Sequence, residues 1–458
     1  MGNLSTQHSW DLFFLVILLV QRQRWRKAIV RTYGCKQAVR QNPKEPFYGF
    51  DFQMKMYMDV PFLYELHQRY GDTYEVSPWI STSTTCTIAP GNLRAINLSK
   101  DFGVSPMRLP GMEYFCGRGF ITTDGDTWRD ARKLLKPSFE LNNVRKLHTL
   151  RREVDVFLKQ LPGDGSTVDL QPLLYVMFMN SALHFVLGVH PSKQASGVPL
   201  TADGFVKSFH DALFYSMLRK FVDTCTAAHG FLDYYINQTF SEIDGPKDKS
   251  LIQALSAQTN DLDFIRSQVI QAMMAAQDTT SELLTNALFR LARHPKYWDR
   301  LRTEFAGKSE DDLSAENLLA LRLHPIFPLL GRIALRDTNL PVGGGPSHDH
   351  PMFIQKGSMV VMDYYALHRN PEVFGDDVET FRPERWDSIK PTQWEVLGFG
   401  GGNRACLGQQ KATIEASYVL ARLAQVIELK MTCKSANGCK VAVYLTEHLA
   451  RSEPNTGL

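Results

Sequence analysis

The feature that most constrains this 458-residue chain is a glycine-rich segment that delivers one cysteine to the start of a helix. It reads Phe-Gly-Gly-Gly-Asn-Arg-Ala-Cys-Leu-Gly over residues 399–408. A helix N-terminus stabilises negative charge and therefore favours ionisation of the Cys406 thiol. Glycines let backbone N–H groups approach the sulfur, and such donors tune a metal thiolate. A lone cysteine at a turn would indicate only a buried thiol, but the ten-residue pattern favours a metal-bound thiolate.

The neighbours of Cys406 suit a flat cofactor that carries carboxylates. Gly408 allows the helix to lie close against a planar group, and Phe399 is placed to stack beside the sulfur. Arg404 is placed to neutralise a carboxylate. With Gly402, these residues match every fixed position of the haem-binding signature of the cytochrome P-450 monooxygenases, which the segment resembles. The resemblance implies a haem-thiolate fold, haem b (iron protoporphyrin IX) as cofactor and Cys406 as the axial iron ligand.

The periodicity of the remaining chain predicts a mainly α fold with a minor β part. A helix is expected over Tyr57–Tyr70, followed by short strands at Tyr74–Val76 and Thr87–Ala89. Residues 264–293 contain no Gly or Pro and predict one long helix that ends before His294-Pro295. A final helix is expected over Leu407–Val426.

An acid and an alcohol lie next to each other inside the long predicted helix. The segment Ala275–Thr280 resembles the oxygen-activation motif of the same family, with Ala276 where the family usually has Gly. Breaking the O–O bond of dioxygen requires two protons, so Thr279 would hold a water and Asp278 would relay protons from solvent. Without the cysteine segment, the pair would indicate only a solvated helix position.

Other arginines follow the family pattern. Trp128 and Arg132 match its Trp-x-x-x-Arg helix, and residues four apart share a helix face, so both are expected to reach a haem propionate. Arg332 occupies a position with the same expected role. The segment 381–386 resembles the Phe-x-Pro-x-Arg element, whose Arg385 is expected to dock on Arg322.

One position departs from the family. The family has Glu-x-x-Arg where this chain has Leu319 three residues before Arg322, so we expect Arg322 and Arg385 to lack the acid that bridges them. A buried charge without a partner costs about 3–5 kcal/mol. The chain also looks short near residue 220 and over 305–320. A non-catalytic product is therefore one alternative to an active enzyme.

The substrate class rests on a second resemblance. The segment Leu340–Pro346 is similar to a Leu-Pro-Val-Gly-Gly-Gly insertion of fungal enzymes that hydroxylate n-alkanes and fatty acids. This branch implies terminal (omega) hydroxylation of a long chain, while another lipophile such as a secondary metabolite is the alternative. Apolar residues at family positions are expected to line the substrate channel, although each has an equally plausible place in the core: Phe115, Met273, Met274, Ile326 and Phe327.

The net charge and the lack of a nucleotide-binding motif indicate which partners the chain can have. Lys and Arg number 51 and Asp and Glu 48, so the net charge of +3 does not support nucleic-acid binding. No Gly-x-Gly-x-x-Gly fingerprint follows a strand, so electrons must come from outside. The resemblance implies a membrane-bound NADPH-cytochrome P-450 reductase as electron donor and O2 as co-substrate. The reductase would meet the basic stripe Arg129, Lys133 and Lys136, unless this is an ordinary solvated face.

The N-terminus predicts a membrane anchor. Residues 12–20 form an unbroken apolar run, and four of residues 22–27 are basic, which favours the cytoplasmic side. We expect a short anchor over residues 1–30 and one catalytic domain over 31–458, at the endoplasmic reticulum membrane and facing the cytosol; a buried N-terminal helix is the alternative. Seven cysteines without a Cys-x-x-Cys pair fit a reducing compartment.

Overall fold

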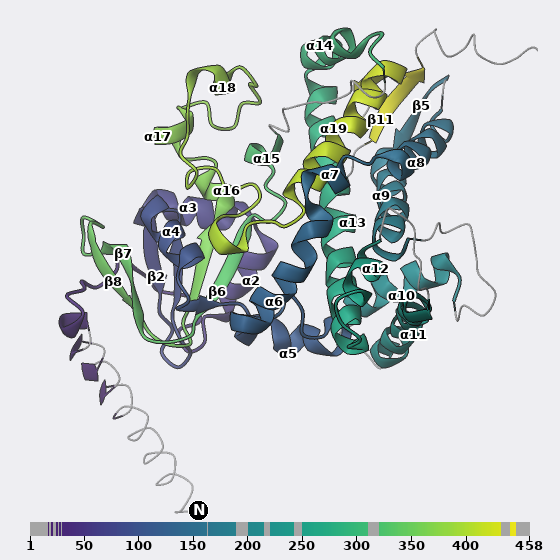
Figure 1. The fold of residues 1–458 in the computed structure, drawn as a ribbon. Helices are drawn as coiled ribbons and strands as arrows, with labels where there is room; N and C mark the ends of the chain where they lie inside the picture. The colour runs from purple at the N-terminus through teal and green to yellow at the C-terminus, as the bar shows by residue number, and fades with distance from the viewer. Residues whose placement is uncertain are drawn as a thin grey trace, which may run out of the picture. The chain divides into compact units, whose positions relative to one another are not determined.

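A computed structural model describes residues 30–445 and scattered residues between 17 and 28 (Figure 1). Outside the description lie residues 1–16, 163, 189–199, 215–219, 242–249, 310–319, 432–439 and 446–458. Most of the predicted anchor and both apparent shortenings fall largely on these positions. The chain divides into two compact units: unit 1 contains residues 1–104 and 327–405, and unit 2 contains 105–326 and 406–458.

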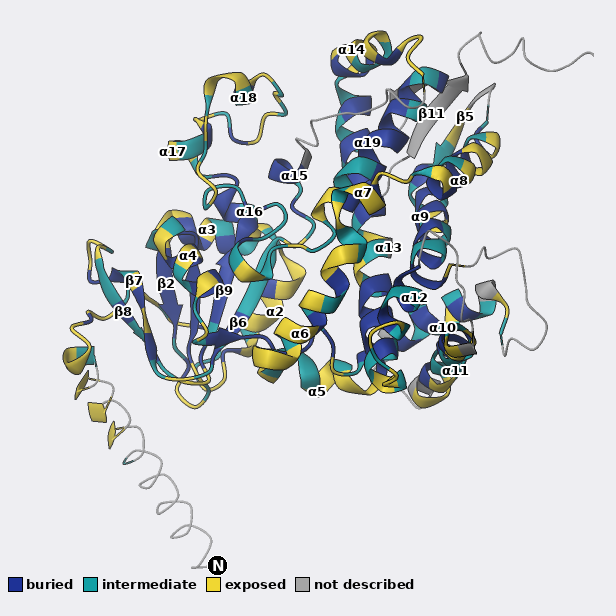
Figure 2. Ribbon diagram, in the orientation of Figure 1, coloured by how far each residue is buried: buried dark blue, intermediate teal, exposed yellow. Residues whose placement is uncertain are grey.

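Unit 1 is built around a six-stranded sheet with the order β1-β2-β3-β9-β6-β4. Strand β9 pairs with β3 in parallel and with β6 in antiparallel orientation. Every residue of β2 and β3 is buried, as Figure 2 shows for the central strands. The strands are β1 Arg40–Gln41, β2 Thr73–Val76, β3 Thr84–Thr87, β4 Phe102–Gly103, β6 Leu329–Ala334 and β9 Met359–Asp363; β7 Thr338–Gly344 and β8 His350–Ile354 form a separate antiparallel pair.

Two local predictions for unit 1 were wrong. The helix expected over 57–70 is two helices, α2 Phe50–Met58 and α3 Pro61–Tyr70, because Pro61 has no N–H to continue α2 and instead begins α3. The second strand is Thr84–Thr87 rather than 87–89, since β-branched threonines suit a buried strand and Pro90 begins the next helix. The strand expected at Tyr74–Val76 is confirmed as β2.

The remaining helices of unit 1 are short: α4 joins β3 to β4, and the others lie between β9 and Cys406. They are α4 Pro90–Leu98, α16 Tyr364–Leu367, α17 Pro371–Phe374, α18 Arg385–Ser388 and the 3-10 turn η3 Gly402–Arg404.

Unit 2 is mainly helical, as predicted. The long helix is confirmed as α13 Leu262–Arg293; Asp261 caps it by accepting from the Phe264 N–H, and Pro295 begins α14. The other elements are α5 Ser105–Cys116, α6 Gly125–Leu135, η1 Lys136–Phe139, α7 Leu141–Val144, α8 His148–Lys159, α9 Leu170–Leu187, α10 Ala202–Phe214, α11 Lys220–Ser241, α12 Leu251–Ser256, α14 Pro295–Phe305, α15 Ala320–Leu323, α19 Gln409–Val426 and the three-stranded sheet of β5 Asp164–Asp169, β10 Ile427–Met431 and β11 Lys440–Leu445.

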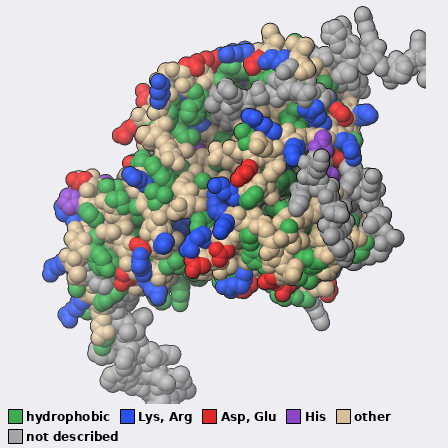
Figure 3. All heavy atoms as spheres, in the orientation of Figure 1, with side chains coloured by type: hydrophobic (Ala, Val, Ile, Leu, Met, Phe, Trp, Pro, Cys, Tyr) green, Lys and Arg blue, Asp and Glu red, His purple; other side chains and the backbone are tan. Residues whose placement is uncertain are grey.

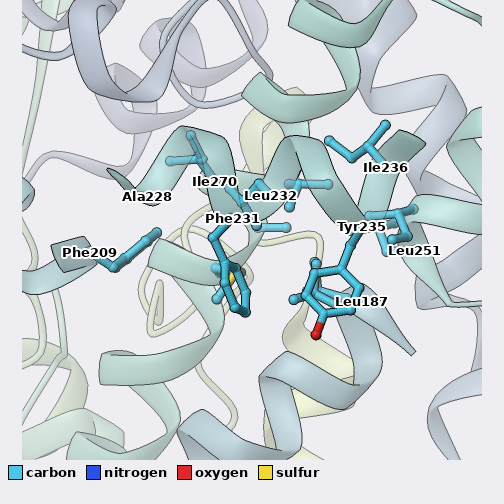
Figure 4. Packing of buried hydrophobic residues seen from close by; sticks show 14 of the residues in the cluster. Leu187, Phe209, Ala228, Phe231, Leu232, Tyr235, Ile236, Leu251 and Ile270 are labelled. Carbon is cyan, nitrogen blue, oxygen red and sulfur yellow. The ribbon is translucent and has the colours of Figure 1, made fainter. Parts of the chain in front are cut away.

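The core of unit 2 gathers apolar side chains from α9, α10, α11, α12 and α13, and Figure 4 shows part of this packing. Phe205 and Phe231 stack with ring centroids 4.3 Å apart. Among the described helices, α9 alone is long and apolar enough to cross a membrane, and more than half of it is buried within the molecule. A helix with that burial belongs to the core of unit 2.

Candidate functional site

The cysteine segment turns tightly before it enters α19. Gly400 and Gly402 have φ angles of +70° and +61°, which favour glycine. A Cβ on Gly402 would lie 2.8 Å from the Asn97 carbonyl oxygen, so the chain passes too close to α4 for any side chain. Ala405 separates η3 from Cys406, and α19 begins three residues after Cys406, at Gln409 rather than at the predicted Leu407.

Cys406 combines an exposed side chain with nearby positive charge. Surrounding protein raises the pKa of the thiol by desolvation, while the Gly408 N–H and the Arg132 guanidinium lower it. Arg132 lies on α6 with its guanidinium carbon 5.9 Å from the Trp128 ring centroid. Burial lowers the pKa of Arg132, and the charge of Cys406 opposes that shift. Arg132 is therefore within electrostatic range of Cys406, and its predicted contact with a haem propionate stays a prediction.

The donor set suits haem better than a bare metal ion. Among the described residues, no three His, Cys, Asp or Glu side chains lie close enough to hold a metal by themselves. One accessible thiol supplies a single ligand, which fits a metal that brings its remaining ligands in a macrocycle. A Cβ on Gly408 would be 3.8 Å from Phe139, an ordinary contact, so packing within unit 2 does not require this glycine. Its lack of a side chain leaves room for a planar group.

Asp278 and Thr279 both lie on α13, next to each other in the sequence. The Thr279 hydroxyl donates to the Ala275 carbonyl oxygen at 2.7 Å, which leaves its own oxygen free to accept from a water. Neighbouring protein raises the pKa of Asp278 by desolvation, and His210 on α10 lowers it. His210 also bonds the Tyr175 hydroxyl through Nε2, at 2.5 Å.

Sequence reasoning missed Tyr175 and His210. Neither residue carries a local motif, and His210 precedes Asp278 by 68 positions. Only the packing of α9, α10 and α13 within unit 2 brings these side chains into electrostatic range. The residue types were visible, but nothing in their spacing indicated that they meet.

Arg385 has an acidic partner, contrary to the expectation that it would lack one. This buried side chain contacts the Asp377 carboxylate at 2.5 Å and also donates to the carbonyl oxygens of Phe374, Asp377 and Thr380. Hydrogen bonds from Arg385 hold the pKa of Asp377 well below its ordinary value. The acid comes from a position eight residues earlier and not from the Glu-x-x-Arg position. Leu319 lies outside the described residues.

A comparison with protein families decides the classification. The family model for cytochrome P-450 matches residues 42–438. The chain belongs to the cytochrome P-450 family. It is 32% identical to cytochrome P-450 monooxygenase fsdH of Fusarium heterosporum, over 91% of this chain and 84% of the relative. It is 33% identical to cytochrome P-450 52A3-A of Candida maltosa and 32% identical to cytochrome P-450 52A12 of Debaryomyces hansenii, over 75% and 76% of both chains respectively.

Family membership fixes the general chemistry of this cytochrome P-450. The family is one of monooxygenases that bind haem b through a cysteine thiolate and insert one oxygen atom from O2. Its members take electrons from a redox partner and act on lipophilic substrates. The fold prediction is confirmed in its helical body and small sheet part, while the N-terminal anchor stays a prediction.

The other arginines predicted to contact haem or to support its site are buried or half-buried. Arg332 is buried on β6 and donates to the Gly331 carbonyl oxygen at 2.9 Å. Arg404 and Phe399 are half-buried in or near η3. Arg322 is buried on α15. The roles assigned to these residues stay predictions.

The predicted channel residues differ in burial. Phe115 and Met273 lie within the unit 2 core, where Phe115 stacks on His229 and meets Phe209 edge to face. Met274 and Ile326 are half-buried, and Phe327 is exposed. Phe115 and Met273 thus have the contacts of core side chains, whereas the other three residues present accessible apolar surface.

Proposed function

We propose that this cytochrome P-450 hydroxylates a long-chain alkane or fatty acid, with Cys406 as the axial ligand of haem. The observation that carries the proposal is the exposed Cys406 thiol at the entry to α19, within reach of the Gly408 N–H and the Arg132 charge. Desolvation raises the pKa of this thiol on balance, and the two neighbouring groups oppose that rise. When bound, haem supplies the oxidising power that inserts one oxygen atom into an unactivated C–H bond. Arg132, Arg332 and Arg404 would neutralise its carboxylates, and Trp128 and Phe399 would pack beside it.

Asp278 and Thr279 would manage protons. Thr279 can accept a hydrogen bond from a water because its own proton is committed to Ala275. Asp278 would take protons from solvent and pass them to that water. Changing Thr279 to Ala should leave substrate binding intact but reduce product per NADPH consumed. Full coupling in that variant would remove Thr279 from the mechanism.

The substrate class rests on the resemblance of Leu340–Pro346 and on the accessible apolar residues Met274, Ile326 and Phe327. Packing within unit 1 also explains the glycines of that segment: a Cβ on Gly343 would lie 2.5 Å from Thr73. The segment therefore supports the substrate class through likeness to the alkane and fatty-acid branch and not through a substrate contact. Hydroxylation of another lipophile is the competing outcome of the test.

The first experiment is the carbon-monoxide difference spectrum of the reduced protein in membranes. A strongly red-shifted Soret band is expected for the natural chain and should be lost in Cys406→Ser. Turnover of dodecanoic acid and n-hexadecane with an added reductase then tests the substrate class. A chain that shows no such band despite its Arg385–Asp377 pair would be a non-catalytic family member, and a chain that has the band but oxidises neither probe would belong to another substrate branch.

We propose an NADPH-dependent reductase as the redox partner, docked on α6. The side chains of Arg129 and Lys133 on α6 and of Lys136 at the start of η1 are exposed, and Figure 3 shows Lys and Arg side chains gathered over this region. Arg129 is already paired with Asp126, so Lys133 and Lys136 offer the more available charge. Changing both lysines to Glu should raise the reductase concentration needed for half-maximal turnover, with less effect at high salt.

Unit 1 presents an apolar surface that supports association with the endoplasmic reticulum membrane. On α2 the exposed residues Phe50, Met54, Tyr57 and Met58 follow the i, i+4, i+7, i+8 pattern of one helix face. The exposed rings of Phe47 and Trp79 meet edge to face beside it, at 5.3 Å. The double change Phe50→Ser with Met58→Ser should ease extraction of the full chain from membranes by alkaline carbonate. Unchanged extraction would leave the N-terminal segment as the sole candidate.

A further inference from the structure

We call the segment Cys116–Thr123, which joins α5 to α6, the 116–123 loop. A fully buried amide side chain of α13 holds it. The Gln271 Nε2 donates to the carbonyl oxygens of the loop's first two residues, at 3.0 and 3.3 Å, and to the Thr122 hydroxyl at 3.0 Å. Its Oε1 accepts from the Ile121 N–H at 2.6 Å. One side chain therefore joins the two ends of the loop.

The loop sequence is adapted to this side chain. A Cβ on Gly119 would lie 2.5 Å from the Gln271 Nε2, so only glycine lets the loop approach so closely. Gly117 has a φ of +65°, and a Cβ there would overlap Ser267 on α13. A second buried glutamine, Gln268, adds one bond by accepting from the Phe120 N–H at 3.0 Å.

The helix face that binds the loop is the face that carries the predicted proton donor. Gln268, Gln271, Ala275 and Asp278 are spaced by three, four and three residues, which places them on one side of α13. Asp278 is seven residues from Gln271, or about 10 Å along the helix. The loop's half-buried Phe120 packs on the same core as Met274 on α13. The position of the loop therefore sets where its apolar side chains stand relative to Asp278.

We propose that Gln271 is a specificity-determining positioning residue, which fixes the 116–123 loop so that Phe120 and Ile121 guide the substrate chain past Asp278 and Thr279. The proposal rests on the proposed hydroxylase function. An unbranched substrate chain has many nearly identical C–H bonds. The choice of the terminal carbon therefore depends on protein side chains that keep a fixed position beside the substrate. A displacement of about 1 Å is enough to change which carbon is presented.

The test compares Gln271→Met with Gln268→Met in the full chain. Both changes keep the side-chain volume close to that of Gln, but the first removes four hydrogen bonds and the second removes one. Three quantities are measured: haem content from the carbon-monoxide spectrum, deuterium exchange of the loop amides, and the ratio of terminal to internal hydroxylation of dodecanoic acid. The variant Thr122→Val removes the hydroxyl that Gln271 contacts, together with the bonds of that hydroxyl to Gly117 and Gly119 within the loop. It serves if Gln271→Met does not accumulate.

In Gln271→Met we expect the haem content to be retained and the Ile121 amide to exchange faster. The ratio of terminal to internal hydroxylation should fall roughly tenfold, which corresponds to the free energy of about one hydrogen bond. Gln268→Met should change the ratio less, and Thr122→Val should change it in the same direction as Gln271→Met. Faster exchange with an unchanged product ratio would overturn the proposal, as would unchanged exchange. If the natural chain binds haem but oxidises neither probe, the substrate class fails, while the exchange data still decide whether Gln271 holds the loop.

Discussion

Arg385 in unit 1 and Gln271 in unit 2 are both buried polar side chains that bind several backbone groups, but they differ in charge and in how far along the chain their partners lie. Arg385 in unit 1 donates to carbonyl oxygens that lie 5 to 11 positions earlier in the chain. Gln271 in unit 2 binds groups 149 to 155 positions away. Arg385 also has the Asp377 carboxylate, whereas the interactions of Gln271 are all neutral.

This difference indicates different roles: Arg385 stabilises a local fold, whereas Gln271 positions a loop. The residues bound by Arg385 form a short segment that closes on itself, so this arginine acts within one local structure. Gln271 instead ties a loop to a helix that is distant in sequence, so it fixes an orientation that local structure leaves open. We therefore expect the loss of Arg385 to cost stability and the loss of Gln271 to cost mainly selectivity.

The largest expected effect is that of Arg385→Leu. The buried bond to the Phe374 carbonyl oxygen and two part-buried bonds to other carbonyl oxygens would be lost, and the Asp377 carboxylate would lose its buried partner. A buried acceptor without a partner costs roughly 1–3 kcal/mol. The free energy of unfolding should fall by at least about 3 kcal/mol, and the yield of haem-loaded protein should fall with it. Urea unfolding followed by tryptophan fluorescence measures the first quantity.

Arg382→Leu is the matched control for that prediction. Arg382 binds the same Asp377 carboxylate at 3.0 Å, but its side chain is 43% exposed. Exposed ion pairs contribute less than about 1 kcal/mol, so this variant should unfold close to the natural midpoint. Equal losses in the two variants would mean that the shared acid, and not the burial of Arg385, determines the stability of this segment.

A second prediction uses pH and concerns a buried carboxyl group of unit 1. Asp363 can respond, because burial raises its pKa to about 7 despite the N–H donors of Ala366 and Tyr365 and the charge of Arg369. The folded state then holds a proton that the unfolded state releases near pH 4, so this group's contribution to stability falls as pH rises from about 4 to 7.

The variant Asp363→Asn should remove that dependence. Relative to the natural chain, its unfolding free energy should rise with pH by at most about 1.4 kcal/mol per unit over that range. His67 contributes with the opposite sign, because burial lowers its pKa to about 4. Its Nε2 lies 3.8 Å from the Asp363 carboxylate, so the two groups are coupled, and the same comparison in a His67→Gln background separates them. Urea titrations at pH 5, 6 and 7 measure the slope, and a difference independent of pH would show that Asp363 is ionised throughout.

The contrast between contacts within a short segment and contacts between distant segments also explains which features could be predicted from the sequence. The cysteine segment, α13 and Arg385 were identified because their patterns lie within about thirty residues and report local geometry. The acid beside Arg385 was missed because Asp377 belongs to no pattern, although it is only eight positions away. Gln271, Tyr175 and His210 were missed because their contacts depend on how helices pack, and Gly117 and Gly119 gave no sign that their partners were side chains of α13.

The smallest expected effect tests whether Gly119 and Gln271 form one unit. In Gly119→Ala the new methyl group would displace the Gln271 amide, and we expect a loss of about 1–2 kcal/mol, comparable to one or two hydrogen bonds. Gly111→Ala is the control: it lies within α5 with no atom within 4 Å of the added Cβ, so helix propensity should leave stability unchanged or slightly higher. In a Gln271→Ala background the three Gln271 atoms within 2.7 Å of the added Cβ are absent, so Gly119→Ala should cost less there than in the natural chain. Additive losses would mean that the loop adapts to the methyl group by moving its backbone, and that Gln271 holds it more loosely than four hydrogen bonds imply.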